Sequence, residues 1–315
     1  MNTALATWTR THLGPQGPVR GTRVTGSRFV PVAVGRPTSP TARSPYHRDL
    51  EAIRTSWQLQ RLDGIGQVFA GGGDGYTTRL THSEEVAGIA ELLAEQLGLD
   101  ETLARAIGLA HDCGHPPLSH TAEPILRTVY PCFSHGKWAA DYQLADLRLS
   151  AEVVDGVRNH SWSSPSPSTA EAELVKWADR FAYLPRDYRD GLLGGFISAN
   201  QPLPDLVVKH LGLSAEQQRA AAMSALIESS SRTGVVSINE DVARALAAFR
   251  AFNAEHFYGH AWIEEHGEGL AEAVRQIVAD VRRTAKEDSV GHTIAAEVTR
   301  LTDSDVVDHA SAYCL

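Results

Sequence analysis

Apolar residues recur at helical spacing along most of this chain. One face of a helix over residues 83–97 would carry the apolar side chains of Val86, Ile89, Ala90, Leu93 and Leu97. Ser83 can accept a hydrogen bond from the backbone at the start of such a helix, and Gly98 can end it. The pattern therefore predicts an amphipathic helix over this segment.

A second helix is predicted directly after the first. Asp100 can cap its start, and the 3.6-residue period is then kept by Leu103, Ala106, Ile107 and Ala110. The period stops at His111 and Asp112, and Gly114 follows as a residue that favours a turn. We therefore expect His111 and Asp112 to lie at the C-terminal end of this helix.

The remaining pattern is also helical. Helices are predicted over residues 121–130, 137–148, 150–159, 169–193, 214–230, 238–256, 265–286 and 292–302. Pro185 is expected to kink the helix over 169–193 without ending it, and the Ser- and Pro-rich residues 161–168 are expected to form a loop. Only residues 28–34 alternate enough to suggest a strand, so the fold class predicted is all-α.

Composition changes this picture little. Hydrophobic residues make up 43% of the 315 residues, which is enough for a substantial core. The three cysteines form no C-x-x-C pair, which favours a reducing, cytoplasmic location. We find no run of about 18 apolar residues and no apolar leader near the N-terminus, so we expect neither a membrane span nor secretion.

The charge is distributed unevenly. A net charge of −9 disfavours a general nucleic-acid coat protein, because affinity for phosphate backbones comes mainly from Lys and Arg. Residues 1–48, however, contain seven arginines and no acidic residue, and many prolines. We expect an extended basic arm over residues 1–44. It could pack on the body or on a neighbouring subunit, contact nucleic acid, or be an upstream extension or targeting segment.

Four residues could supply ligands for a divalent metal. His82, His111, Asp112 and Asp179 offer two imidazoles and two carboxylates from separate predicted helices. Taken singly, a histidine at a helix start is often a cap or a surface residue, and a lone aspartate in a helix is usually solvated. Their joint occurrence in this order favours a metal site.

Four successive motifs carry a resemblance to a known family. They are Gln60-Arg61-Leu62 with Gln67-Val68-Phe69, Thr78-Arg79-Leu80-Thr81-His82-Ser83, His111-Asp112-Cys113-Gly114-His115-Pro116-Pro117 through Glu123, and Ala178-Asp179-Arg180-Phe181-Ala182-Tyr183 through Asp187 and Asp190. In order and spacing they resemble the HD-domain deoxynucleoside triphosphate triphosphohydrolases, the dGTPase-like family. The resemblance covers about residues 45–195.

The resemblance implies a fold and a reaction. The fold would be an HD-domain helical bundle over residues 45–200, with additional C-terminal helices over 201–315 packed on it. The reaction would be hydrolysis of a deoxynucleoside triphosphate to deoxynucleoside and tripolyphosphate, by attack of water at the α-phosphorus. The metal would be held by His82, His111, Asp112 and Asp179, and its identity is open among Mn, Mg, Fe, Co, Ni and Zn.

The resemblance also assigns residues beside the metal. The residues for catalysis and phosphate contact would be three histidines and one carboxylate, namely His115, His120, His135 and Glu123. Spacing alone makes His120 and Glu123 neighbours on a helix surface, which suits a proton-transfer pair. His160 could be a further ligand in a two-metal site or a helix cap.

Substrate contacts follow from the same resemblance. Gln67 would lie near sugar and base, Arg79 would bind phosphate, Tyr183 would pack on the deoxyribose, and Asp187 would accept a hydrogen bond from its 3′-hydroxyl. Spacing places Asp179, Tyr183 and Asp187 on one helix face. Arg180 and Arg186 could bind phosphate or form surface ion pairs.

Two other functions stay open at this point. The same metal site could act on a nucleoside monophosphate or another phosphate ester, or the protein could be a nucleotide-binding regulator without catalysis. The proton-transfer residues weigh against the last. A deoxynucleotide substrate and a homo-oligomer are expected from the resemblance.

Overall fold

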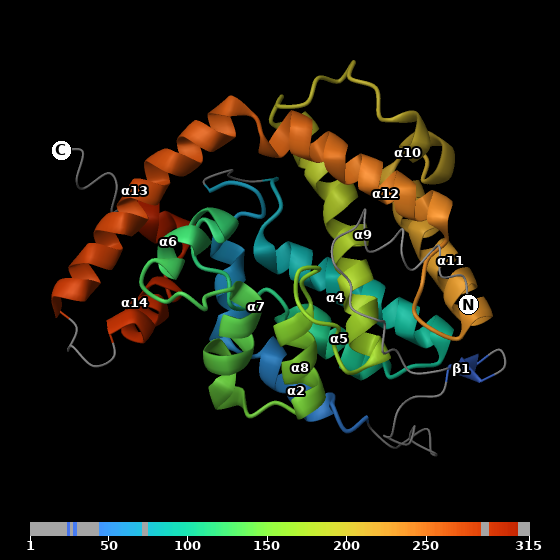
Figure 1. Cartoon of the computed structure of the whole chain (residues 1–315), viewed down its shortest axis with the longest axis horizontal. Helices are drawn as coiled ribbons and strands as arrows, with labels where there is room; N and C mark the ends of the chain where they lie inside the picture. The colour runs from blue at the N-terminus through green and yellow to red at the C-terminus, as the bar shows by residue number, and fades with distance from the viewer. Residues whose placement is uncertain (1–23, 26–27, 30–43, 71–74, 285–289, 308–315) are drawn as a thin grey trace.

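The structure is a computed structural model that describes residues 24–25, 28–29, 44–70, 75–284 and 290–307 (Figure 1). Two short antiparallel strands, β1 (Val24–Thr25) and β2 (Arg28–Phe29), pair near its start. The rest of the described secondary structure is helical, which confirms the predicted all-α class. Most of the expected basic arm, and residues 30–34 of the suggested strand, lie outside the described residues.

The helices follow one another in a simple order. The α-helices are α2 (His47–Arg54), α3 (Trp57–Gln60), α4 (Arg79–Leu97), α5 (Glu101–Ala110), α6 (Glu123–Arg127), α7 (His135–Trp138), α8 (Ala151–Asn159), α9 (Ala170–Leu193), α10 (Asp205–His210), α11 (Ala215–Thr233), α12 (Glu240–Asn253), α13 (Ala261–Thr284) and α14 (Val290–Val298). Short 3₁₀ and π segments are η1 (Arg61–Gly64), η2 (Ser119–Thr121), η3 (Ala139–Gln143), η4 (Ala145–Leu147) and η5 (Ala254–Tyr258).

Helix α4 begins one turn earlier than expected. Thr78 caps it by accepting a hydrogen bond from the backbone of Thr81, and Gly98 ends it in the left-handed conformation at φ 70°. The prediction of Ser83 as the cap was wrong, because Ser83 is fully buried inside the helix. As a result His82 lies within the first turn of α4, three residues after Arg79.

Helix α5 confirms its prediction. Asp100 accepts a hydrogen bond from the backbone of Leu103, and the helix ends at Ala110 with His111 as its last cap residue. The chain then turns tightly past Gly114. A side chain at Gly114 would lie 2.1 Å from the carbonyl oxygen of His135, so only glycine allows the turn to approach the start of α7 this closely.

Helix α9 continues through Pro185 as one element. This confirms the prediction that Pro185 does not end the helix. Proline removes a backbone donor from a helix. Beside it, the side-chain amide of Asn253 donates to the carbonyl of Leu184 at 2.9 Å. Asn253, at the end of α12, therefore ties α12 to α9 near the proline.

Two hydrophobic clusters hold the helices together. The larger lies among α2, α4, α5, α8, α9, α11 and α12, with α4 and α9 crossing near the middle of the molecule (Figure 1). The smaller joins residues around α6 and α7 to α13 and α14 through Leu126, Phe133, Trp138, Val274 and Ile294. None of the helices in the described ranges is long and apolar enough to cross a membrane.

Short elements were predicted less well. The single helices expected over 121–130 and 137–148 are broken into η2 with α6 and into α7 with η3 and η4. The helices α2, α3 and α10 had not been expected, since each is too short to show a full apolar period.

The close packing of α4 on α5 depends on one glycine. A Cβ at Gly108 would lie 2.7 Å from the Cα of Ala87, so Gly108→Ala should force the two helices apart. We expect the free energy of unfolding to fall by about 1–3 kcal/mol, measured by denaturant titration.

Gly88→Ala is the matched control, because Gly88 neighbours Ala87 on α4 but nothing lies within 4 Å of its Cβ position. That variant should be more stable by about 0.5–1 kcal/mol, since alanine favours the helix. Equal effects at the two positions would contradict this account of the packing.

Candidate metal centre

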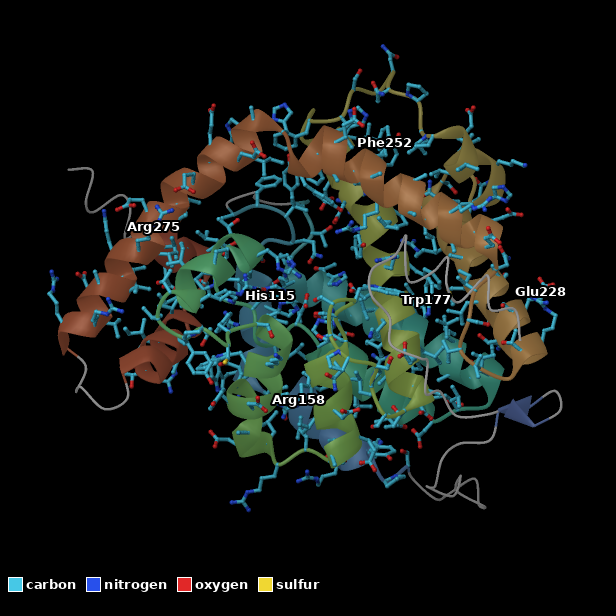
Figure 2. The ribbon with its side chains drawn as sticks, in the orientation of Figure 1. His115, Arg158, Trp177, Glu228, Phe252 and Arg275 are labelled. Carbon is cyan, nitrogen blue, oxygen red and sulfur yellow. The ribbon has the colours of Figure 1, made fainter. Side chains whose placement is uncertain are left out.

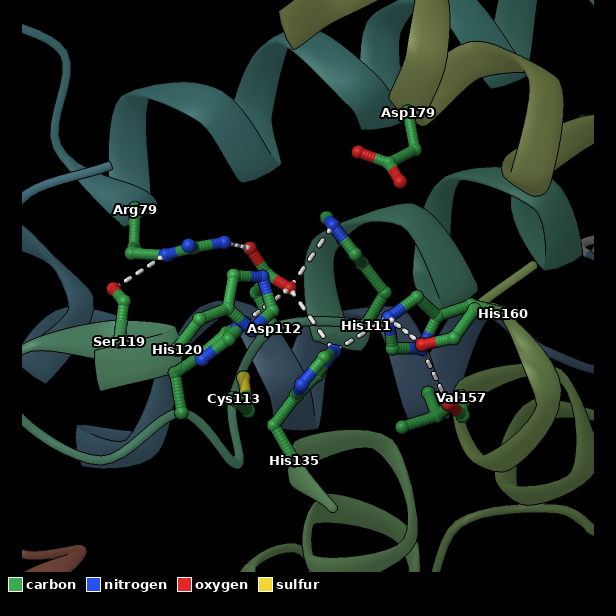
Figure 3. A network of polar contacts seen from close by, with 12 residues as sticks. Arg79, His111, Asp112, Cys113, Ser119, His120, His135, Val157, His160 and Asp179 are labelled. Carbon is green, nitrogen blue, oxygen red and sulfur yellow. Dashed lines mark hydrogen bonds and ion pairs between the residues drawn. The ribbon is translucent and has the colours of Figure 1, made fainter. Parts of the chain in front are cut away.

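The four predicted metal ligands come together at the middle of the bundle. His82 comes from the first turn of α4. His111 and Asp112 come from the end of α5, and Asp179 comes from α9 (Figure 3). His82 Nε2 lies 3.1 Å from Asp179 Oδ1 and 3.8 Å from Asp112 Oδ2. His111 Nε2 lies 3.4 Å from Asp112 Oδ1. Four side chains from three helices thus point at one small region.

The protonation of this group suits a cation. His111 Nδ1 lies 2.6 Å from the carbonyl oxygen of Gly108, so Nδ1 carries the proton and Nε2 is free as a ligand. Burial lowers the pKa of His111, which keeps the ring neutral. Burial alone would raise the pKa of Asp112, but His111 and Arg79 outweigh it and hold that pKa well below its usual range. Asp112 is therefore an ionised carboxylate in the interior.

His82 and Asp179 form a pair that a metal would divide. Burial alone would lower the pKa of His82, but its hydrogen bond with Asp179 raises the pKa above the ordinary value. A metal ion would replace the proton between them, so metal affinity is expected to rise with pH. Two imidazoles and two carboxylates form a donor set that fits Mn, Fe, Co, Ni or Zn. The spacing of the donors also suits one ion, since the ligand atoms of His82, His111 and Asp112 lie within 4.8 Å of one another.

A second cluster lies directly beside these ligands. Glu123 Oε1 lies 3.1 Å from His120 Nδ1 and 2.7 Å from His135 Nδ1. Burial alone would raise the pKa of Glu123, but the hydrogen bonds from both rings keep it below its usual range. One ionised carboxylate therefore orients two imidazoles.

His115 and His120 differ in access. His115 is fully buried near the middle of the molecule (Figure 2), stacks on His135 at 3.8 Å between ring centroids, and has neither ring nitrogen hydrogen-bonded within the described part of the chain. The side chain of His120 is 67% exposed. Of the clustered histidines, His120 is thus the one that solvent and a ligand can reach most directly.

The guanidinium of Arg79 is held by the protein itself. It donates to Ser119 Oγ at 2.9 Å, to Asp112 Oδ2 at 2.7 Å and to the carbonyl of Gln67 at 3.0 Å. These contacts position the Asp112 carboxylate. A phosphate contact by Arg79 stays a prediction, and these three hydrogen bonds use three of the five N–H donors of the guanidinium.

Two predicted sugar-contacting residues lie along α9 with Asp179. Tyr183 is half-buried, while Asp187 is buried and accepts a hydrogen bond from Tyr258 at 2.6 Å. Burial raises the pKa of Asp187 to about 7. Asp187 Oδ1 and Gln67 Oε1 are buried acceptors with no partner among the residues described. Both atoms are therefore available to a ligand donor.

The two further arginines differ from each other. Arg186 forms an ion pair with Glu85 at 3.0 Å, and Arg219 pairs with the same carboxylate. Arg186 therefore fits the ion-pair interpretation. Arg180 lies over the ring of Trp162 at 4.1 Å, a cation–π contact. Both contacts are with side chains other than the four predicted metal ligands.

Two residues that support the site had not been predicted. Tyr258, in η5, holds Asp187, and Asp303 accepts hydrogen bonds from the backbone of Gly66 at 2.8 Å and Leu118 at 2.7 Å. Leu118 and Ser119 both have positive φ, near 60° and 50°, so the turn before η2 is strained and Asp303 stabilises it. No local sequence signal marks either residue.

Comparison with known proteins agrees with this geometry. The centre and the helices around it define an HD domain, and the HD domain profile matches residues 79–184. A deoxyguanosinetriphosphate triphosphohydrolase-like protein from Caldanaerobacter subterraneus is 34% identical over 224 residues, covering 69% of this chain and 66% of the relative. One from Geobacter metallireducens is 36% identical over 186 residues, covering 50% and 48%.

These matches show the family. The chain belongs to the HD-domain dGTPase-like family, which confirms the resemblance seen in the sequence. It spans about half to two thirds of the length of these curated relatives. A hypothetical protein from Aquifex aeolicus shares the fold, with a TM-score of 0.52 at 21% identity over 83% of this chain and 67% of that one.

Asp187 should give the protein a specific dependence on pH. The folded state keeps the carboxyl protonated up to about pH 7, while the unfolded chain releases the proton near 3.8. Stability from this group is therefore present below pH 4 and is lost as the pH rises toward 7, by at most about 1.4 kcal/mol per unit.

Asp187→Asn removes this titration. The difference in free energy of unfolding, wild type minus Asp187→Asn, should fall between pH 4 and 7 and then level off, as measured by urea titration. A difference that stayed constant or rose with pH would contradict the raised pKa.

Proposed function

We propose that this protein hydrolyses deoxynucleoside triphosphates to deoxynucleoside and tripolyphosphate, with a divalent metal ion. The observation that carries the proposal is the convergence of His82, His111, Asp112 and Asp179 beside the carboxylate-held imidazole of His120. Membership of the dGTPase-like family supports the substrate class. Cytoplasmic location and a homo-oligomer are part of the same proposal.

The four ligands and the proton carriers would have separate tasks. A divalent ion held by His82, His111, Asp112 and Asp179 supplies polarisation of a phosphoryl oxygen and orientation of water. Glu123 fixes the ring of His120 through Nδ1, which leaves Nε2 for proton transfer. As water attacks the α-phosphorus, it gives a proton to Nε2 of His120, and its oxygen stays on tripolyphosphate. The bond to O5′ breaks, and the protonated His120 passes that proton to O5′.

The α9 face would select the sugar. Tyr183 and Asp187 follow Asp179 at successive turns of α9, so a nucleotide with its phosphates at the metal places its sugar along this helix. The free acceptors Asp187 Oδ1 and Gln67 Oε1 would take donors from the sugar and base. An aromatic ring beside C2′ would disfavour a ribose hydroxyl.

Product analysis tests the proposed reaction. We would incubate the protein with each dNTP, each NTP and deoxynucleoside monophosphates, with Mn²⁺, Mg²⁺ or Co²⁺, and resolve products by ion-exchange chromatography. Tripolyphosphate with free deoxynucleoside is expected from dNTPs only. Release of orthophosphate alone would indicate a phosphomonoesterase, and tight dNTP binding without turnover by any metal would indicate a regulator.

His120→Ala separates proton transfer from metal binding. Because His120 is outside the metal ligand set, the variant should lose about 10²–10⁴-fold in kcat while its metal content stays at the wild-type level. Asp112→Ala should lose activity and metal together, as measured by elemental analysis. His210→Ala, in α10 and remote from the centre, is the control. An active Asp112→Ala protein with verified loss of metal would refute the assignment.

A further inference from the structure

The segment that follows α14 holds two loops of the site at once. Asp303 is buried, and its two carboxylate oxygens accept hydrogen bonds from the backbone of Gly66 at 2.8 Å and of Leu118 at 2.7 Å. Gly66 lies in the loop before α4, and Leu118 lies in the turn that leads into η2. One side chain from the C-terminal part of the chain therefore joins two loops that are far apart in the sequence.

The guanidinium of Arg79 lies between the same two loops. It donates to Ser119 Oγ at 2.9 Å and to the carbonyl of Gln67 at 3.0 Å, and also to Asp112 Oδ2 at 2.7 Å (Figure 3). Ser119 and Gln67 are the residues directly after the two that Asp303 holds. The position of Arg79 beside the proposed metal ligand therefore depends on both loops.

The hydroxyl of Ser119 joins the two loops a second time. It donates to the carbonyl oxygen of Gly66 at 3.0 Å and accepts from Arg79 Nε at 2.9 Å. Because a hydroxyl has one proton, its donation to Gly66 leaves a lone pair directed at the guanidinium. This arrangement lasts only while the two loops stay together.

The turn itself needs a partner for Leu118. Leu118 and Ser119 have φ of 60° and 50°, a region that residues other than glycine rarely adopt. The hydrogen bond from Leu118 to Asp303 is buried, so its loss would leave an unpaired donor in the interior. His120 follows Ser119 directly. Asp303 thus fixes the backbone from which the proposed proton carrier extends.

The four proposed metal ligands are held in a different way. They lie on α4, at the end of α5 and on α9, which pack together in the larger hydrophobic cluster. Leu118 and α6 instead pack on α13 and α14 in the smaller cluster, which also contains Val306. Loss of the Asp303 contacts should therefore disturb the proton carrier while the metal ligands stay in place.

We propose that Asp303 is a positioning residue for the hydrolysis, because it places Arg79 and His120 at the metal through the two loops it joins. This inference rests on the proposed function and adds to it a residue that acts through others. The segment after α14 then contributes to turnover as well as to stability.

Asp303→Asn tests the proposal in the full-length protein. Asparagine is close to aspartate in size, but its amide nitrogen cannot accept, so one of the two backbone donors loses its partner. With dNTPs and Mn²⁺, kcat and kcat/KM should both fall by about 10–100-fold, since a small displacement of reacting groups slows the transition state by that much. Bound Mn²⁺, measured by elemental analysis, should stay at the wild-type level.

Asp305→Asn is the matched control. Asp305 lies in the same segment, is exposed, and accepts hydrogen bonds from the backbone and hydroxyl of Thr302, both at 2.7 Å. This variant should change kcat by less than about twofold.

Hydrogen exchange followed by mass spectrometry gives a readout that does not depend on activity. In Asp303→Asn, exchange should become faster in residues 64–68 and 116–121 and should keep the wild-type rate in α4, α5 and α9. Faster exchange in all of these helices would mean a general loss of stability and would overturn the positioning role.

The kinetic results separate this inference from the proposed function. An Asp303→Asn protein with the kcat of the wild type, or one that loses Mn²⁺ together with activity, would overturn the positioning role alone. If Asp303→Asn does not fold, Ser119→Ala breaks the same connection at its other end, and an unchanged kcat there would overturn the role. A wild-type protein that forms no tripolyphosphate would refute the proposed function, and the positioning role with it.

Discussion

The rest of the structure depends on one buried carboxylate, that of Asp112. Removing an unpaired carboxylate from water costs several kcal/mol, so its charge must be matched inside the protein. Arg79 donates to one oxygen, and His111 and His115 lie 3.4 Å from the other. These partners come from α4, the end of α5 and the turn after it, which makes the carboxylate a common point of attachment for these three segments.

The fold is arranged to hold that point in place. Gly108 brings the backbones of α4 and α5 close together, and Gly114 lets the turn that follows approach α7. The C-terminal part of the chain contributes as well. Asp303 accepts hydrogen bonds from Gly66 and Leu118, and Arg61 donates to the carbonyls of Leu301 and His115. The segment that follows α14 therefore supports the strained turn that carries Ser119 and His120.

How much could be predicted from the sequence depended on the range of each interaction. Helix α5 and its Asp100 cap were predicted because capping is local, whereas Ser83 was mistaken for a cap because Thr78 and Ser83 both precede apolar positions. The four proposed metal ligands could be picked out because His82, the His111-Asp112 pair and Asp179 form a recognisable order, and the structure brings their side chains together. Tyr258 and Asp303 were missed, since each acts on a residue 71 or more positions away and neither stands in a motif.

Anomalous X-ray scattering would show directly whether Asp112 organises a divalent-metal centre. Crystals of the full chain grown with Mn²⁺ would be measured at a wavelength where manganese scatters anomalously. We expect a strong anomalous peak within bonding distance of the Asp112 carboxylate and of His82 and His111. A crystal saturated with Mn²⁺ that showed well-ordered side chains and no peak beside Asp112 would contradict it.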